Sequence, residues 1–145
     1  MGGRGASSGR KSGGVFLDTR LKIGRHKAEI AMAHWLYENF GGSIRVINDQ
    51  KGVAKKNPDY LWNGKYWDLK TISNEKAADG AIRHGVKQIK ENPGGLILDY
   101  AGATLDKSKL IEIMDNRVRR HPENAIRIIV VRDGKLAIDK KYKKR

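Results

Sequence analysis

Asp59, Asp68 and Lys70 are the residues whose types and spacing could do chemistry. The two aspartates flank Asn63-Gly64, the strongest short-range signal for a β-hairpin with a two-residue type I′ turn. That turn fixes a register in which Asp59 lies opposite Asp68, with Cβ atoms roughly 4.5 to 5.5 Å apart. Strand alternation then puts Lys70 on the same face as Asp68.

Two facing carboxylates repel each other, but a divalent cation between them reverses the sign of the interaction. Mg²⁺ or Mn²⁺ is the expected ion because both prefer oxygen ligands, and Zn²⁺ is an alternative. A lysine beside the pair could stabilise charge on a phosphate or help to activate a water molecule. The alternative is purely structural: Asp59 follows a proline in a turn, and Asp68 lies on an exposed strand.

The same residues resemble a known motif. Pro58-Asp59, eight intervening residues and Asp68-Leu69-Lys70 are similar to the motif of the PD-(D/E)xK nucleases. The resemblance implies a restriction-endonuclease-like central mixed sheet with the motif on a hairpin and helices on both sides. It also implies metal-dependent hydrolysis of phosphodiester bonds, with the Leu69 carbonyl as a further ligand of the ion.

Glu29 is the expected third carboxylate, because many members of that family add an acidic residue from the helix before the hairpin. In a helix over residues 24 to 40, Glu29 shares a stripe with Ala33, Leu36 and Phe40, whereas Glu38 faces away. The alternative is that Glu29 only stabilises the first helical turn.

Within that superfamily, the chain most resembles small basic toxin domains of bacterial contact-dependent growth inhibition, several of which act on transfer RNA or DNA. In some of them the lysine lies on the helix after the hairpin, which makes Lys87 a second candidate for the catalytic lysine. The residues expected to contact nucleic acid are Lys65, Tyr66, Arg83, Gln88 and Lys90.

This resemblance also carries expectations about origin and partners. It implies delivery into the cytoplasm of a target cell as part of a larger protein, and a cognate acidic immunity protein. Related domains also occur in phage structural proteins, so a bacterial or phage origin is expected.

Composition supports a nucleic-acid partner. The 145 residues carry 30 Lys and Arg against 16 Asp and Glu, a net charge of +14, which favours a polyanion. The sequence contains no long apolar run of the kind that would indicate a membrane partner. Cysteine is absent, which excludes disulfides and thiolate nucleophiles, and the four histidines lack metal-ligand spacing, although His26 or His34 could neighbour the site.

A second functional class also fits the charge, namely a non-catalytic basic module that only binds nucleic acid. Such a module leaves the opposed aspartates unexplained, because they would weaken its contact with phosphates. The Asp68→Asn variant separates the two classes: a nuclease loses cleavage, whereas a binding module is unchanged or improved.

The elements that must position these residues form a single α/β domain with a mixed sheet. Periodicity and turn signals predict helices at 24–40, 77–91 and 105–120, the last with Thr104 as N-cap, and strands at 43–49, 96–100, 125–131 and 135–139 besides the hairpin at 57–70. Pro93-Gly94-Gly95 is expected to stop the second helix. The predicted boundaries are a flexible Gly/Ser-rich leader at 1–14, the nuclease-like domain at 15–139 and a basic tail at 140–145.

Overall fold

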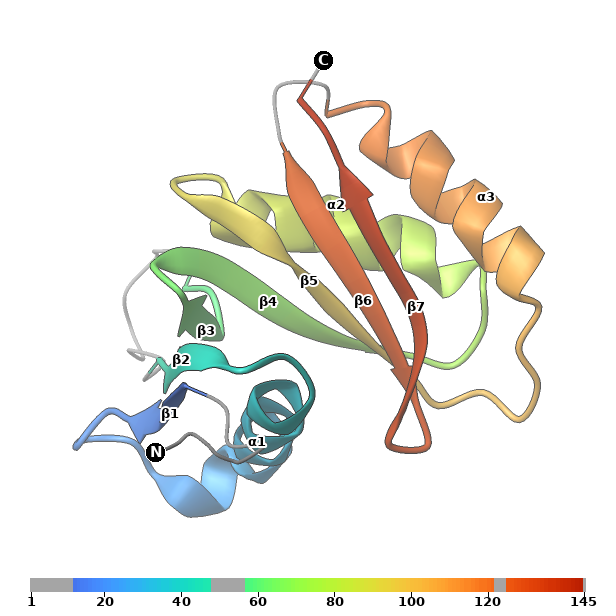
Figure 1. The fold of residues 1–145 in the computed structure, drawn as a ribbon. Helices are drawn as coiled ribbons and strands as arrows, with labels where there is room; N and C mark the ends of the chain where they lie inside the picture. Colours follow the sequence, from blue (N-terminus) through green and yellow to red (C-terminus); the bar gives the residue numbers. More distant parts are fainter. Residues whose placement is uncertain (1–11, 48–56, 122–124, 145) are drawn as a thin grey trace.

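The computed structural model describes residues 12–47, 57–121 and 125–144. It contains a seven-stranded sheet, a 3₁₀ turn and three helices (Figure 1). The first half of the chain forms β1 (Gly13–Leu17), η1 (Ile23–Arg25), α1 (Lys27–Phe40), β2 (Gly42–Val46), β3 (Tyr60–Trp62) and β4 (Lys65–Ile72). The second half forms α2 (Ala77–Ile89), β5 (Pro93–Tyr100), α3 (Lys107–Val118), β6 (Ile126–Arg132) and β7 (Lys135–Tyr142).

The strands lie in the sheet in the order of the sequence, from β1 to β7. β1 runs parallel to β2, and β4, β5 and β6 run parallel to one another, whereas β3 and β7 join through antiparallel ladders. Each parallel pair is connected by a helix, as a crossover requires. The predicted class, a single α/β domain with a central mixed sheet, is confirmed.

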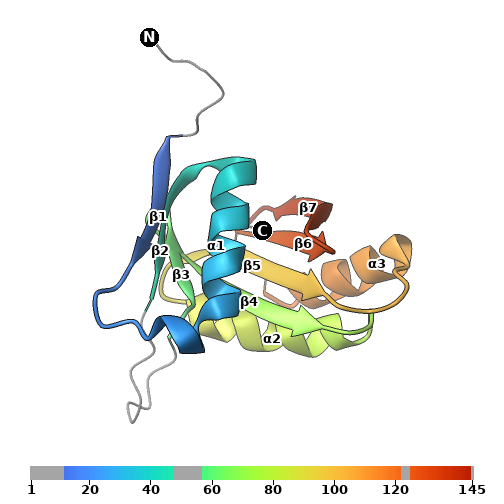
Figure 2. The ribbon, with the colours of Figure 1, turned by 90° about the horizontal axis from the view of Figure 1, so that it is seen from below.

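Helices cover both faces of the sheet. Figure 2 shows α1 on one side, over β1 to β3, and α2 and α3 on the other side. Two apolar cores result: one lies between the sheet and α2 and α3, and the other joins α1 to the inner face of β2, β3 and β4. β5 and β6 contribute to both cores, which explains why their sequences read as nearly continuous apolar runs.

The hairpin of β3 and β4 has the predicted register. Tyr60 pairs with Trp67, and Trp62 pairs with Lys65. Asn63 and Gly64 both have positive φ, 50° and 80°, as a type I′ turn requires. This turn therefore places the flanking side chains as the sequence indicates.

Several predicted boundaries are wrong. β1 begins at Gly13, inside the predicted leader, and β7 extends to Tyr142, inside the predicted basic tail. Pro93 to Gly95 do not only end a helix, because they begin β5. The third helix is capped by Asp106, whose side chain accepts a hydrogen bond from Lys109 N, and not by Thr104. The remainder of the leader, residues 1–11, and the end of the strand predicted at 43–49 lie outside the described residues.

The order of the elements explains these differences. β1 adds to the edge of the sheet through a parallel ladder with β2, a long-range pairing that no local pattern reports. The lysines near the end of β7 belong to the sheet, because the ladder of β7 with β6 continues as far as the pair Ile126–Tyr142. A charged sequence at an edge strand resembles a tail when it is read alone.

Candidate active site

A polar hollow of about 380 Å³ lies where α1, the hairpin and α2 approach one another. It is lined by the predicted residues Glu29, Asp59, Asp68, Leu69, Lys70 and Gln88, together with His26, Ile47, Asn57 and Pro58. Residues that are far apart in the sequence are thus brought together around the two aspartates.

The two aspartates are held by the hairpin. Asp59 precedes β3, and its Oδ2 accepts a hydrogen bond of 2.8 Å from the backbone N–H of Leu69. Asp68 lies in β4 and is the one buried charged residue in the described part of the chain, with 3% of its surface exposed. The N–H and C=O of a strand residue point the same way, so the Leu69 carbonyl also points to the side of β4 where Asp59 lies.

Lys70 lies beside this pair. Its Nζ is 3.1 Å from Asp68 Oδ2, and about a third of its side chain is exposed. Among the described residues, Asp68 Oδ2 has Lys70 as a charged neighbour but accepts no hydrogen bond. A buried carboxylate oxygen without a hydrogen bond is costly for stability, which marks it as an atom available to another ligand.

Electrostatics at the pair oppose ionisation. Burial raises the pKa of Asp59 to about 8, and the negative charge of Asp68 adds to the rise, while the hydrogen bond from Leu69 N lowers it. The same carboxylates and Glu29 raise the pKa of the buried Tyr60 hydroxyl, after the larger effect of burial. The hollow therefore gathers carboxyl groups that resist full ionisation, although the protein is strongly basic.

Glu29 is positioned by a contact between α1 and the hairpin. The Tyr60 hydroxyl donates a hydrogen bond of 2.6 Å to the backbone carbonyl of Glu29. The Glu29 side chain is 26% exposed, and its Oε1 lies 3.5 Å from His26 Nδ1. Because Tyr60 directly follows Asp59, this bond holds the start of α1 next to the aspartates.

The residues present suit an oxygen-ligated cation. Asp59 and Asp68 supply carboxylate oxygens, and the buried Asp68 Oδ2 accepts no hydrogen bond from the described part of the chain. Within residues 12–47, 57–121 and 125–144, no three His, Asp or Glu side chains gather into a ligand set. A closed zinc site of protein ligands is thus not formed there, whereas Mg²⁺ and Mn²⁺ are commonly bound by one or two carboxylates, water and substrate phosphate.

The other predicted residues lie outside the hollow. Arg83, Lys87 and Lys90 are exposed on α2, where only Gln88 turns toward the aspartates. Tyr66 packs against the core under α2 and α3, and Lys65 lines a different hollow at the tip of the hairpin. The bulge between Tyr66 and Trp67 in the ladder with β5 shifts this part of β4 relative to its neighbour.

Two further polar residues line the hollow. The sequence indicates that His26 or His34 could neighbour the site, and His26 lines the hollow. It lies three positions before Glu29, a spacing that places two side chains on one helix face. Asn57 directly precedes the Pro-Asp pair, and it carried no recognisable pattern.

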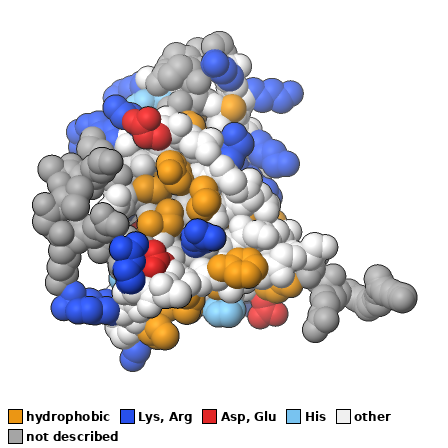
Figure 3. All heavy atoms as spheres, turned by 90° about the vertical axis from the view of Figure 1, so that its left-hand side faces the viewer, with side chains coloured by type: hydrophobic (Ala, Val, Ile, Leu, Met, Phe, Trp, Pro, Cys, Tyr) orange, Lys and Arg blue, Asp and Glu red, His pale blue; other side chains and the backbone are white. Residues whose placement is uncertain are grey.

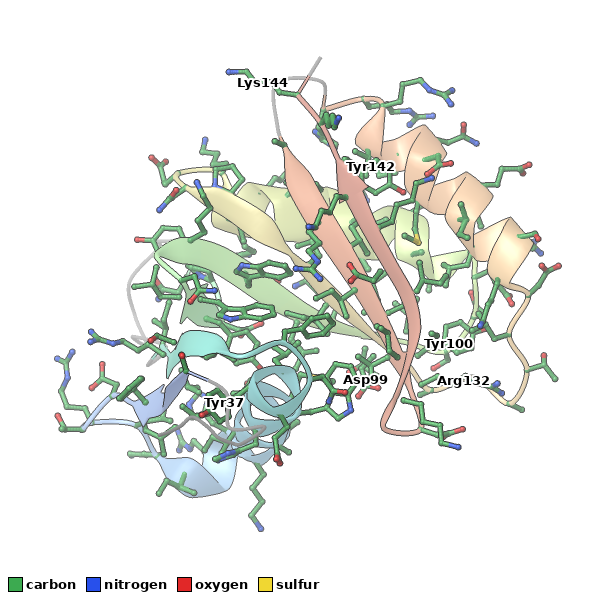
Figure 4. The ribbon with its side chains drawn as sticks, in the orientation of Figure 1. Tyr37, Asp99, Tyr100, Arg132, Tyr142 and Lys144 are labelled. Carbon is green, nitrogen blue, oxygen red and sulfur yellow. The ribbon has the colours of Figure 1, made fainter. Side chains whose placement is uncertain are left out.

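Asp99 shows that a raised pKa alone does not define the site. Burial raises the pKa of this carboxyl group, and the charge of Asp133 adds to the effect. Asp99 lies with Tyr100 and Arg132 toward the other end of the sheet (Figure 4). There, Arg132 donates to the carbonyl of Ala103 and Tyr100 donates to that of Thr104, so these groups hold the backbone.

The described helices include none that is long and apolar enough to cross a membrane.

A comparison with curated protein sequences gave no match. Among solved structures, a chain of the CdiA-CT/CdiI toxin and immunity complex from Burkholderia pseudomallei is similar in fold, with a TM-score of 0.52 and 17% sequence identity. The alignment covers 88% of this chain and 100% of that chain. The sequence-family model of the contact-dependent growth inhibition CdiA C-terminal domain matches residues 55–136 of this chain. This range includes the two aspartates, Lys70 and α2. The chain belongs to the family of the contact-dependent growth inhibition CdiA C-terminal domain.

Proposed function

We propose that this domain is a toxin-type, metal-dependent endonuclease of the PD-(D/E)xK kind, which hydrolyses phosphodiester bonds in nucleic acid. The observation that carries the proposal is the hollow in which Asp59, Asp68 and Lys70 lie together on one hairpin. The family match and the net charge of +14 support a toxin with a polyanionic substrate. Transfer RNA or DNA is the proposed substrate.

In this proposal Asp59 and Asp68 hold Mg²⁺ or Mn²⁺, with the Leu69 carbonyl as a further ligand and Glu29 as a ligand or an acceptor for water. When bound, the ion supplies charge stabilisation at the phosphate and lowers the pKa of a water ligand. Removal of the proton from Asp59 accompanies cation binding, because the free pair resists ionisation.

Lys70 is the proposed catalytic lysine. Its Nζ lies beside Asp68 and in the same hollow, so a phosphate held there by the carboxylate site would lie within reach of the ammonium. A fixed positive charge next to the reacting phosphate stabilises the charge that develops in the transition state. Lys87 is exposed and does not line the hollow, which makes it the weaker candidate.

A cognate acidic immunity protein is the proposed second partner. The structurally similar chain comes from a complex that is described as a toxin with its immunity protein. The charged side chains on the face beyond β1, which appears on the left of Figure 1, are mostly Lys and Arg around an apolar centre (Figure 3). Such a face suits an acidic protein, through electrostatic steering and apolar contact.

The test is cleavage of total bacterial RNA and of plasmid DNA by the wild type and by Asp68→Asn, with Mg²⁺, Mn²⁺ or Zn²⁺ and with EDTA. We expect the wild type to cut one of the two substrates with Mg²⁺ or Mn²⁺, and Asp68→Asn to lose at least about 100-fold in rate. The matched control is Asp79→Asn, because Asp79 pairs with Arg117 on the far side of α2.

Tight binding without cutting under any ion would contradict the nuclease and leave the non-catalytic binding module. Cutting that persists in EDTA would contradict the metal dependence alone. Cutting that survives in Asp68→Asn at the wild-type rate would place the active site elsewhere.

A further inference from the structure

A second hollow, called here the tip hollow, lies at the turn of the same hairpin. Its volume, about 380 Å³, equals that of the hollow around the aspartates. It is lined by Trp62 and Trp67 from the hairpin, by Gly94 at the start of β5 and by three basic residues, Lys65, Arg127 and Lys141. The mechanism proposed above uses none of these residues.

Two buried tryptophans form a rigid apolar wall of the tip hollow. The rings of Trp62 and Trp67 lie with their centroids 4.7 Å apart, and only 4% and 6% of these residues is exposed. Trp62 Nε1 donates a hydrogen bond of 3.0 Å to the carbonyl of Gly41, which fixes its ring. A ligand in the tip hollow therefore meets an apolar wall that is packed and partly hydrogen-bonded.

Gly94 packs closely against this wall. A Cβ at position 94 would lie 2.4 Å from Trp67 Nε1 and 2.9 Å from Lys65 Cβ, closer than atoms can approach. A side chain at this position would therefore force Trp67 or Lys65 to shift. The glycine therefore allows the start of β5 to pack directly against the indole of Trp67.

Two cations of the tip hollow make no ion pair with the residues that the structure describes. Arg127 is engaged, because it makes two hydrogen bonds with Asp139 and lies 4.8 Å over the ring of Phe40. Lys65 and Lys141 are exposed, and neither makes a salt bridge with any residue in the described parts of the chain. Lys141 lowers the pKa of Asp139 only through its charge. These ammonium groups are thus available to an anionic ligand.

The hairpin connects the tip hollow to the aspartates. Trp62 lies three residues after Asp59, and Lys65 lies three residues before Asp68, which is roughly 10 Å along a strand. An odd spacing also changes the face of the sheet, so Lys65 and Trp67 lie on the side of α1, whereas Asp68 lies on the side of α2. One nucleic-acid strand that contacts both hollows therefore passes around the hairpin over several nucleotides. The tip hollow lies near the upper end of β7, where Figure 4 labels Tyr142, which also lines it.

We propose that the tip hollow binds an unpaired nucleotide of the nucleic-acid substrate, a few positions from the bond that is cut. Its base lies against the edges of Trp62 and Trp67, and its phosphates contact Lys65 and Lys141. This inference rests on the proposed nuclease function and specifies the substrate as a single-stranded or looped region, because the bases of an intact duplex cannot enter a hollow.

The experiment measures binding apart from cleavage. The full chain carrying Asp68→Asn is titrated in EDTA with single-stranded oligouridylate, and the readout is intrinsic tryptophan fluorescence. We expect a fluorescence change on binding, and a loss of about twofold to fivefold in affinity for each of Lys65→Ala and Lys141→Ala. Each substitution should also lower the slope of log K against log salt by about 0.7.

Lys135→Ala is the matched control, because Lys135 is exposed at the turn between β6 and β7 and lines neither hollow. Trp67→Phe should bind oligouridylate with a smaller fluorescence change, and circular dichroism shows whether it is folded. A blunt RNA duplex should bind without the tryptophan signal.

Equal affinity of the Lys65, Lys141 and Lys135 variants would overturn the proposal, and so would a tryptophan signal that the duplex reproduces. Failure of oligouridylate to bind would also overturn it. In each case, metal-dependent cleavage by the wild type would leave the proposed function intact, so failures of the two proposals are distinguishable.

Discussion

The carboxylates of this protein fall into two regions with opposite electrostatics. On the outer surfaces, Asp79 makes two hydrogen bonds with Arg117, and Asp139 makes two with Arg127. These hydrogen bonds hold the pKa of both carboxyl groups below the ordinary value. In the hollow, Asp59 lies buried beside Asp68, and burial followed by the charge of Asp68 raises the pKa of Asp59.

This difference shows that the arrangement of Asp59 and Asp68 lowers the stability of the folded protein. A chain with 30 basic residues could have paired Asp59 with an arginine, as it does with Asp79 and Asp139. Instead, the ion pair that the described residues form with these aspartates is between Lys70 and Asp68, and Asp68 Oδ2 accepts no hydrogen bond from them. Groups that are arranged against stability and that converge in a hollow are typical of functional sites.

The largest effect expected from this comparison concerns the two candidate lysines. Lys70→Ala should lower the cleavage rate by about 100-fold or more, because it removes a charge that contacts the site. Lys87→Ala should lower it by less than about tenfold, through weaker binding alone. The measurement is the single-turnover rate on whichever substrate the wild type cuts.

Both variants should stay folded, because neither side chain is buried. A large loss of rate in Lys87→Ala with little loss in Lys70→Ala would reverse the assignment and move the catalytic lysine to α2. Equal small losses in both variants would remove lysine from the chemistry.

The second effect is on stability. In metal-free protein, Asp59→Asn should increase the free energy of unfolding at pH 8, by something on the order of 1–3 kcal/mol, because it removes a buried carboxyl group that resists ionisation. The Asn side chain can still accept the hydrogen bond from Leu69 N. The measurement is urea unfolding in EDTA.

The sign of the pH dependence follows from the direction of the shift. Between pH 4 and pH 8 the unfolded chain has lost the proton of Asp59, while the folded chain retains it. Folding therefore takes up a proton, and wild-type stability should fall as pH rises through this window. Asp59→Asn should remove that fall, and a wild-type stability that rises from pH 4 to pH 8 would show that Asp59 ionises freely.

The hairpin and the sheet class could be predicted because their signals are local. Asn63-Gly64 specifies one turn type, and the turn fixes the pairing of Tyr60 with Trp67 without any other information. β1 could not be predicted, because Gly13 to Leu17 form a strand only through a parallel ladder with β2. Its pattern of exposure, with Phe16 and Leu17 facing solvent, lacks the alternation of a half-buried strand.

The candidate site was predictable to the extent that it follows from the hairpin and the first helix. Asp59, Asp68 and Glu29 line one hollow, but no three carboxylates of the described residues form a ligand set. On α2, periodicity gave the buried face, but it could not say which exposed side chains point toward the aspartates. Gln88 lines the hollow with the aspartates, whereas Arg83 and Lys87 do not. The sequence could not indicate this, because the orientation of α2 over β4 and β5 depends on long-range packing.

The smallest effect should occur at an outer pair. Asp139→Asn removes the ion pair with Arg127, and it should lower the free energy of unfolding at pH 7 by about 0.5–1 kcal/mol, because the pair is partly exposed and screened by solvent. The Arg127 hydrogen bonds hold the pKa of Asp139 below its usual value of 3.8 in the folded chain. Their contribution is thus present above that value and lost as pH falls below it. Urea unfolding at pH 7 and at pH 3 should therefore show a difference between wild type and Asp139→Asn that shrinks at the lower pH.

At Asp59 the difference in free energy of unfolding between wild type and Asp59→Asn has the opposite sign at pH 8. It is also smaller at acid pH, where the Asp59 carboxyl group is neutral in both the folded and the unfolded chain. The same substitution, Asp to Asn, should destabilise the protein at the surface pair and stabilise it in the hollow. If both positions were destabilised to the same extent, the two regions would be equivalent, and the carboxylates of the hollow would be ordinary structural groups.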